Sequence, residues 1–477
     1  MKRFESLRFK CETITSTLAA VALACGGVAF SQPTITDLGT FPGGQVSSAL
    51  RVSGDGSVVV GYAPASGATA GMENLGVLPG SGSSSAPDDI FNLGTLGGTN
   101  SNGYAINDAG QVAGVSLRIG DATGHAFRYS GTPGSGGAMV DLGTLGGEGS
   151  EAFGINDAGQ VAGASSTTGG PPHAFRYTGT PGSGGAMADL GTLGGTDSYG
   201  YGINDAGQVT GLSSTTGGPP HAFRYTGTPG SGGAMVDLGT LGGTYSWGSA
   251  INNAGQVTGW SPPTTGADIH AFLYTSTPGL GGAMVDLGTL GGEISAGIAI
   301  NDAGQVAGNS NPTGSGYHHA FRYTGTPGSG GAMVDLGTLG GTSSYSLGIN
   351  DAGFVVGYAE QSAAAAGGSL VATLCQTDAA NTAVDLEAWL NATNPTLGAF
   401  WRLTVAQDIN NNGLITGWGV YDDGPGGLSD GFRAYILDAS SLVPEPASAV
   451  MLVLGAIGVL ARTRCEKIWN RRDPRDG

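Results

Sequence analysis

The chain has 477 residues, 92 of them glycine, and a formal net charge of −18. The glycines follow no Gly-X-Y period, which excludes collagen, and 39% hydrophobic with only 11% charged residues excludes the highly charged kind of disorder. Residues 32–461 contain eight arginines, no lysine and 31 acidic residues, which excludes a basic surface that tracks nucleic acid.

The N-terminal 31 residues have the three parts of a secretory signal peptide. A basic start precedes an apolar run from Leu18 to Phe30, and small residues stand at Ala29 and Ser31. This pattern predicts export, with cleavage before Gln32.

A repeat of 48 or 49 residues fills most of the segment 32–441, which we predict to be one domain. Each unit holds a phrase like Ile203-Asn204-Asp205-Ala206-Gly207, one like His221-Ala222-Phe223-Arg224-Tyr225, and one like Asp237-Leu238-Gly239. The first phrase begins at Val52, Ile106, Ile155, Ile203, Ile251, Ile300, Ile349 and Ile409. The third begins at Asp37, Asn92, Asp141, Asp189, Asp237, Asp286, Asp335 and Asp385.

Each unit is predicted to contain four strands. The first two flank the Asn-Asp-Ala-Gly phrase, because Asn and Asp favour the first turn positions and Gly supplies the left-handed residue of a type I turn with a bulge. The His-Ala-Phe-Arg-Tyr and Asp-Leu-Gly phrases form the third and fourth strands. The connection 226–233 between them has no strand character. Four strands in about 48 residues are typical of a β-propeller blade.

The two ends of the array predict how the ring closes. The exported chain begins with a fourth-strand phrase at 36–40, before any hairpin, and the last unit stops after its third strand at 432–437. We therefore expect an all-β propeller of about eight blades, with the N-terminal strand completing the last one. Seven blades are the alternative, because the first unit spans 55 residues and lacks a His-Ala-Phe phrase.

The repeat resembles the extracellular HAF repeat family. The phrase that names the family stands at His125, His173, His221, His270 and His319. The resemblance extends from about residue 33 to 438 and includes a divergent last unit. It implies a secreted bacterial repeat protein and carries no established activity.

Residues 442–477 resemble the PEP-CTERM sorting signal of Gram-negative and related bacteria. Val443, Pro444, Glu445 and Pro446 precede an apolar run from 447 to 461 and an arginine-rich tail. Fifteen residues of helix would span about 22 Å, short for a permanent membrane helix. The resemblance implies an exosortase-type peptidase as partner, and contact with the membrane only through this segment before processing.

The recurrent polar residues are predicted to be scaffold. The histidines occur once per blade, too far apart to share a metal, and are expected to form hydrogen bonds between blades. The repeated arginines are expected to tie neighbouring blades, with the aspartate of Asp-Leu-Gly as the suggested partner. These arginines are Arg128, Arg176, Arg224, Arg322 and, in the last unit, Arg433.

Two places break the repeat. Asp408, Asn410 and Asn412 match the first half of a calcium-binding loop, although Gly419 stands where a bidentate carboxylate is needed. Since they also overlay the ordinary hairpin turn, calcium is the weaker interpretation and no other cofactor is expected. The segment 360–395 is predicted to be either a blade with a decorated outer edge or a specific site, and its Cys375 a structural core residue.

The sequence favours a non-catalytic, exported repeat protein that serves at the cell surface or in the extracellular matrix and binds polysaccharide or surface proteins. The alternative is a secreted propeller enzyme, a glycan hydrolase or lyase. Carboxylates and aromatic residues from different blades at one mouth of the ring would favour the enzyme, whereas a mouth of Gly, Ser and Thr would favour the structural role. Any binding function is expected where the repeat breaks.

Overall fold

The computed structural model describes residues 32–40, 46–64, 72–77, 90–120, 123–132, 135–266, 268–276, 282–326, 329–362, 369–375, 383–422 and 431–443. Within these ranges, Pro33–Ala439 forms one compact unit. The predicted signal peptide, Pro444, Glu445, Pro446 and the apolar run 447–461 lie outside the described residues. Within the described ranges, no helix is long and apolar enough to cross a membrane.

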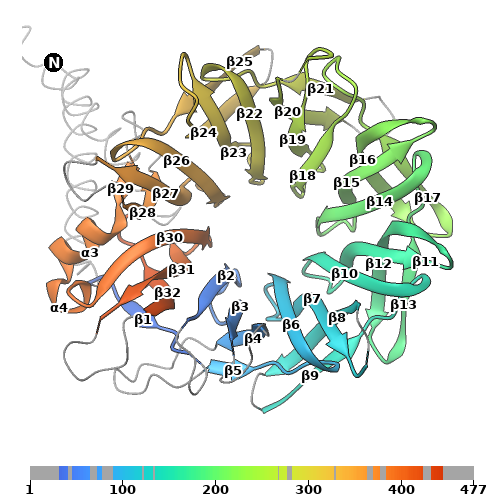
Figure 1. The fold of residues 1–477 in the computed structure, drawn as a ribbon, viewed down its shortest axis with the longest axis horizontal. Coiled ribbons are helices and arrows are strands. Elements are labelled where there is room, and N and C mark those ends of the chain that lie inside the picture. Colours follow the sequence, from blue (N-terminus) through green and yellow to red (C-terminus); the bar gives the residue numbers. More distant parts are fainter. Residues whose placement is uncertain are drawn as a thin grey trace, which may run out of the picture. The chain divides into compact units, whose positions relative to one another are not determined.

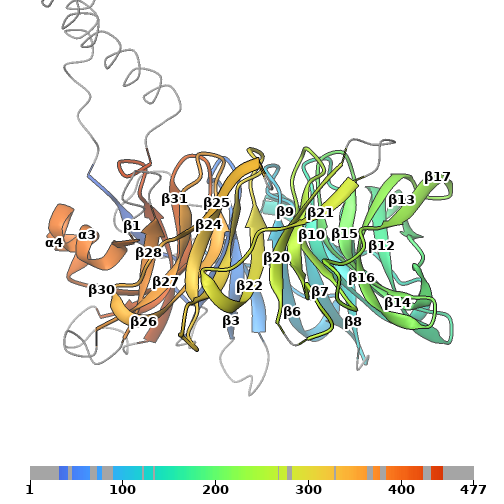
Figure 2. The same ribbon diagram turned by 90° about the horizontal axis from the view of Figure 1, so that it is seen from above.

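The unit Pro33–Ala439 contains, in its described part, eight four-stranded antiparallel sheets arranged as the blades of a β-propeller (Figure 1). Figure 2 shows the ring from its edge, with the blades side by side. This confirms the predicted fold class. We number the blades 1 to 8 in the order of their first strands.

The first four blades follow one another along the chain. Blade 1 is β2 (Ser48–Val52), β3 (Val59–Pro64), β4 (Met72–Val77) and β5 (Ile90–Asn92). Blade 2 is β6 (Gly97–Ile106), β7 (Val112–Arg118), β8 (Gly124–Thr132) and β9 (Ser135–Asp141). Blade 3 is β10 (Gly146–Ile155), β11 (Val161–Thr167), β12 (Gly170–Thr180) and β13 (Ser183–Asp189). Blade 4 is β14 (Gly194–Ile203), β15 (Val209–Thr215), β16 (Gly218–Thr228) and β17 (Ser231–Asp237).

The last four blades continue in the same way. Blade 5 is β18 (Trp247–Ile251), β19 (Val257–Ser261), β20 (His270–Ser276) and β21 (Gly282–Asp286). Blade 6 is β22 (Gly291–Ile300), β23 (Val306–Pro312), β24 (His319–Thr326) and β25 (Ser329–Asp335). Blade 7 is β26 (Gly340–Ile349), β27 (Val355–Gln361), β28 (Leu370–Cys375) and β29 (Ala383–Asp385). Blade 8 is β30 (Trp401–Ile409), β31 (Leu414–Tyr421), β32 (Gly431–Asp438) and β1 (Ile35–Asp37).

The N-terminal strand closes the ring, as predicted. β1 pairs antiparallel with β32, with Ile35 opposite Leu437 and Asp37 opposite Tyr435. The Asp37 carboxylate also accepts a hydrogen bond from the buried Arg433 guanidinium at 3.1 Å. The two ends of the repeat array are therefore held in one sheet by backbone pairing and by an ion pair.

The Asn-Asp-Ala-Gly phrase forms the predicted turn. In blade 4 the Gly207 amide donates to the Asn204 carbonyl at 2.9 Å, and the Asn204 side-chain oxygen accepts from the Gln208 amide at 2.9 Å. Gly207 has a φ of +72°, the left-handed value that a side chain would strain. The phrase is therefore turn chemistry in the form that the sequence indicates.

The connection 226–233 differs from the prediction. β16 continues to Thr228 and β17 starts at Ser231, so the third and fourth strands form one long hairpin, with Thr226 opposite Ala234 and Thr228 opposite Gly232. Gly230 has a φ of +72° in the turn. Strand pairing with β16 overrides the low strand propensity of the glycine-rich segment.

The core lies between blades. Phe223 of blade 4 is fully buried and packs with Tyr225 against Ala174 and Leu190 of blade 3. The same arrangement of Phe and Tyr against a preceding Ala and Leu recurs at blades 3, 5 and 6, and at blade 2 Val60 takes the place of the Ala. Blades 2 to 6 thus bury the aromatic face of their third strands against the preceding blade.

The segment 360–395 belongs to blade 7 and to the connection that follows it. β28 and β29 complete the blade, and two short helices, α3 (Leu386–Thr393) and α4 (Pro395–Gly398), lie on its outer side (Figures 1 and 2). Cys375 pairs with Val355 at the position of Tyr323 in blade 6, and burial raises the pKa of its thiol to about 12. This matches the interpretation as a blade with a decorated edge and Cys375 as a core residue.

Candidate functional site at the mouth of the ring

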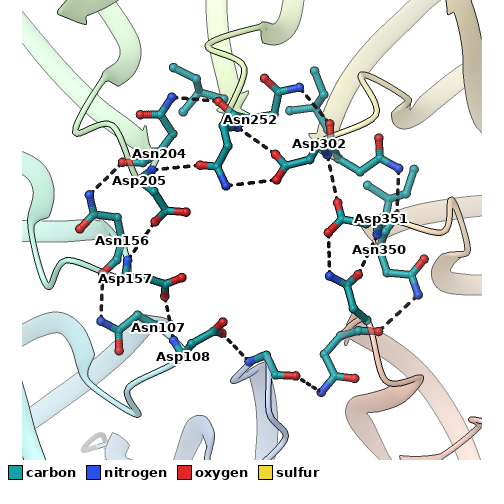
Figure 3. Close-up of a pocket in the computed structure, with 18 of the residues that line it drawn as sticks. Asn107, Asp108, Asn156, Asp157, Asn204, Asp205, Asn252, Asp302, Asn350 and Asp351 are labelled. Atoms are coloured by element: carbon teal, nitrogen blue, oxygen red, sulfur yellow. Dashed lines mark hydrogen bonds between the residues drawn. The ribbon is translucent and has the colours of Figure 1, made fainter. Parts of the chain in front are cut away.

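The first hairpin turns of all eight blades meet around one opening. They line a cavity of about 350 Å³ (Figure 3). Each blade contributes one Ile, or Val52 in blade 1, and the two residues after it, apart from Ser53. A side chain that looks like a local turn residue in one unit is therefore part of a shared surface in the ring.

The buried asparagines of the turns form a relay of hydrogen bonds between blades. The Asn156 amide donates to the Asn204 carbonyl at 2.8 Å, and Asn204 donates in turn to the Asn252 carbonyl at 2.9 Å. The remaining links join Asn107 to Asn156, Asn252 to Asn301, Asn301 to Asn350, Asn350 to Asn410, and Asn410 to Ser53. Each asparagine thus stabilises its own turn and the neighbouring one.

The next residue of each turn forms a second relay. The Asp157 amide donates to the Asp205 carboxylate at 3.1 Å, and the Asp205 amide donates to the Asn253 side chain at 3.0 Å. The remaining links join Gly54 to Asp108, Asp108 to Asp157, Asn253 to Asp302, Asp302 to Asp351, and Asp351 to Asn411. One oxygen of each of the five aspartates is held in this way (Figure 3).

Both relays are interrupted at blade 1. Ser53 stands at the asparagine position and donates to Asp55 at 2.8 Å, and Gly54 stands at the aspartate position and has no side chain. Beside this gap, the Asp408 carboxylate of blade 8 accepts from the Val52 amide at 3.2 Å. Burial raises the pKa of Asp408, and the charge of Arg51 opposes that shift. The seam between the last and first blades is thus the asymmetric part of the mouth.

The mouth carries negative charge. Its aspartates are exposed and come one from each of blades 2, 3, 4, 6 and 7. Desolvation raises the pKa of Asp157, and the charges of Asp108 and Asp205 raise it further. Each carboxylate accepts from the equivalent backbone amide of the preceding blade, and Asp302 and Asp351 also accept from the side chains of Asn253 and Asn411. Acid–base catalysis needs paired groups with divergent pKa values, whereas these carboxylates are spaced one to a blade.

An arc of aromatic rings lies next to the mouth on one side, on the first strands that lead into the hairpin turns. We call Tyr104, Phe153, Tyr201 and Trp247 the aromatic arc. They lie on the first strands of blades 2 to 5, and the centroids of successive rings are 6.4, 5.4 and 5.0 Å apart. All four are partly exposed.

The aromatic arc is not part of the repeat. Tyr104, Phe153 and Tyr201 lie two residues before the Ile that lines the cavity, and in four other blades this position holds Leu50, Ile298, Leu347 and Gln407. The opposite side of the ring is therefore aliphatic or polar at the same level.

The repeated histidines do not tie blades together, which corrects the prediction. Each imidazole Nδ1 lies 2.8–3.1 Å from the aspartate of the fourth strand in its own blade, for example His221 with Asp237. The reason is register, because Phe223 pairs with Asp237 and the side chain of His221 lies two residues along the same strand face.

The repeated arginines do tie blades, but through a different partner from the one suggested. Arg128 of blade 2 donates to the carbonyls of Gly159 and Gly179 in blade 3. The aspartates are already engaged by the histidines and by the amide two residues later. Only in blade 8, among the described residues, does an arginine of this series bind the strand-four aspartate, the Arg433–Asp37 pair.

The calcium candidates occupy an ordinary turn. The Asn410 side-chain oxygen accepts from the amides of Asn412 and Leu414 at 3.0 and 2.9 Å, and Asn412 donates to the Gly54 carbonyl at 3.2 Å. The bond from the Leu414 amide recurs in the equivalent turns, as between Gln208 and Asn204, whereas the two Asn412 bonds are specific to this turn. No group of three or more His, Cys, Asp or Glu that could hold a metal occurs in the described part of the chain. Calcium binding by these residues stays a prediction.

Replacing Asn204 by Ala is expected to destabilise the protein by about 2–3 kcal/mol. The buried side chain bonds the Gln208 amide, the Gln208 side chain and the Asn252 carbonyl, and each lost bond leaves a partner unsatisfied. Urea denaturation measures the effect. The matched control is Asp205→Asn, which keeps the acceptor for Asp157 and should stay within about 0.5 kcal/mol. Equal losses in both variants would contradict the assignment of roles.

Replacing Asp157 by Asn is expected to stabilise the protein slightly at neutral pH, by no more than ~0.5 kcal/mol because the group is exposed. The pKa of Asp157 is raised above 3.8 in the folded state, so protonation favours folding and the wild type loses stability as pH rises through that raised value. The advantage of the variant should therefore vanish below pH 3.8 and shrink in high salt. Melting temperatures across this pH range test it, and a pH-independent difference would refute it.

No protein-family model and no curated protein matches the chain. Among solved structures, the chain is similar to a puromycin hydrolase mutant at 16% identity and a TM-score of 0.41, covering 78% of this chain and 58% of that one. It is also similar to a gluconolactonase from Xanthomonas campestris (13% identity, TM-score 0.30, 60% of this chain and 93% of that one). A mutant of AofleA from Arthrobotrys oligospora matches at 11% identity and a TM-score of 0.29, covering 64% and 91%.

Proposed function

We propose that the chain is a non-catalytic, exported propeller that binds an extracellular polysaccharide at the cell surface or in the matrix. The aromatic arc is the observation that carries this proposal. Partly exposed aromatic rings from four successive blades form a continuous strip, and a strip of this kind suits a linear ligand better than a single small molecule. Tyrosine and tryptophan present an apolar body with a polar tip, which suits the mixed surface of a sugar.

The recurrent polar residues support a scaffold role for the rest of the ring. The asparagines, arginines and histidines are all engaged in hydrogen bonds within or between blades. The mouth and its wall do contain carboxylates and aromatic residues from different blades, which is the combination expected of the enzyme alternative. The uniform backbone contacts and one-per-blade spacing of the mouth carboxylates favour binding over acid–base chemistry.

The two ends of the chain supply the proposed location. The predicted signal peptide directs export, and Val443, Pro444, Glu445 and Pro446 form the proposed sorting motif, with an exosortase-type peptidase as partner. Replacing Glu445 by Ala should leave the C-terminal segment on the protein recovered from cells. Intact-mass measurement checks this, and a shortened product from the variant would contradict the sorting role.

A glycan array probed with the purified protein tests the binding function. The expected result is selective retention on one class of linear polysaccharide. The variant Tyr201→Leu should lose that retention while keeping its fold, because blades 1 and 7 carry Leu50 and Leu347 at the same position. Absence of binding to every polysaccharide would overturn the proposal.

A further inference from the structure

We infer that the polysaccharide is a cationic amino-sugar chain, one whose units carry free ammonium groups. The inference rests on the proposed function and specifies its ligand. It comes from carboxylates that lie among the aromatic rings on the same side of the ring.

The wall that bears the aromatic arc has acidic groups and no basic ones. The first strands and turns of blades 2 to 5 contain no Lys or Arg. Their carboxylates are Glu148, Glu151 and Asp197 on the strands and Asp108, Asp157 and Asp205 at the mouth. An anionic polysaccharide would meet like charge along the whole strip, which costs binding energy.

Two of these carboxylates contact or influence the aromatic rings directly. Burial is the main cause of the raised pKa of the Tyr104 phenol in blade 2, and the nearby charge of Glu151 in blade 3 is the next. Asp197 accepts from the Ser214 hydroxyl at 2.7 Å and contributes to the raised pKa of Tyr199 and Tyr201, for which burial is the main cause. Glu151 and Asp197 are both partly exposed. Negative charge therefore lies beside the rings, on the same first strands that carry Phe153 and Tyr201.

This combination suits a sugar ring that carries an ammonium group. The C–H faces of pyranose rings can pack on the aromatic strip, and ammonium groups can pair with Glu151, Asp197 and the aspartates of the mouth. Acetylation of the amine would remove the charge and leave only the packing. Replacement of the amine by a carboxylate would turn the attraction into repulsion.

The opposite side of the mouth is electrically different. Arg51 lies on the first strand of blade 1, directly before Val52, which lines the cavity. The charge of Arg51 acts on Asp408 of blade 8. The two charges offset each other there. Blades 6 and 7 also carry acidic groups, Glu293, Asp302 and Asp351, so it is the aromatic arc together with the negative charge that selects the side of blades 2 to 5 for a cationic sugar chain.

Isothermal titration of the purified full chain with three sugar hexamers tests the inference. The probes are a glucosamine hexamer, an N-acetylglucosamine hexamer and a galacturonate hexamer, at about pH 6 where the amines carry charge. We expect the glucosamine hexamer to bind most tightly, with an affinity that falls as salt is added. The variants Glu151→Gln and Tyr201→Leu should each lower it by about tenfold.

The control is Glu293→Gln, the same kind of substitution on the first strand of blade 6, away from the aromatic arc. It should leave the affinity unchanged. Tighter or equal binding of the acetylated or the galacturonate hexamer would overturn the inference and leave the proposed function standing. An affinity for the glucosamine hexamer that is unchanged in both the Glu151→Gln and the Tyr201→Leu variant would also overturn it. Failure of all three hexamers together with an empty glycan array would overturn the proposed function itself.

Discussion

Deletion of residues 33–40 is expected to cost the protein at least about 5 kcal/mol of folding free energy. The deletion removes β1 and so leaves the backbone edge of β32 unpaired. It also removes the buried Ile35 and Leu38, each contributing about 2 kcal/mol. Arg433, which is 4% exposed, would lose Asp37, and an uncompensated buried charge costs about 3–5 kcal/mol.

Thermal denaturation followed by circular dichroism measures this effect. Thr36→Ala is the matched control, because Thr36 lies in the same strand but is exposed and should matter little. A synthetic peptide of residues 33–40 added in excess should restore part of the lost stability. A deletion variant that melts at the wild-type temperature would show that the ring does not depend on closure by β1.

Replacing Phe223 by Ala is expected to destabilise the protein by about 3–5 kcal/mol. The side chain is fully buried between blades 3 and 4, in contact with Ala174, Leu190 and Val209, so its removal leaves a cavity that the rigid strands cannot fill. Urea denaturation gives the change in free energy of unfolding.

The control is Val236→Ala on β17 of the same blade, where the side chain is 43% exposed. That substitution should change stability by less than about 0.5 kcal/mol. If the two variants behave alike, the packing between blades does not provide the main stabilisation of the ring.

The fold could be predicted largely from the repeat itself. Asn204, Asp205 and Gly207 specify a tight turn by local chemistry, and the count of such phrases gives the count of blades. The unpaired fourth-strand phrase at Asp37 indicated closure, because a missing strand at one end matched a spare one at the other. The turn depends on residues that are neighbours in the sequence, and the closure depends on the order of the repeat phrases along the chain. Both can be seen in the sequence alone.

The misjudged contacts depend on which groups lie opposite one another. The hairpin through 226–233 is stabilised by pairing across strands, which the propensity of a glycine-rich segment does not show. The partner of Arg128 is a carbonyl in the next blade, and strand alternation indicates the face of a side chain but not the atoms across from it.

The candidate site was partly hidden for the same reason. In the sequence Asp205 has the pattern of a turn residue, and only closure of the ring brings it beside its counterparts in the neighbouring blades. The aromatic arc was visible in principle, because Tyr104, Phe153 and Tyr201 stand at one fixed position before the turn while Leu347 replaces them in blade 7. Comparing the units position by position would have revealed it.

One measurement tests the proposed function most directly. The protein and the polysaccharide are incubated together for a long time, separated by size, and their masses measured by light scattering. The sample contains the purified protein and the polysaccharide that the array selects. Binding without catalysis predicts that polymer and protein elute together, and that the mass of the polymer stays at its starting value. A polymer that is progressively shortened would contradict the non-catalytic role, and separate elution of the two components would contradict binding.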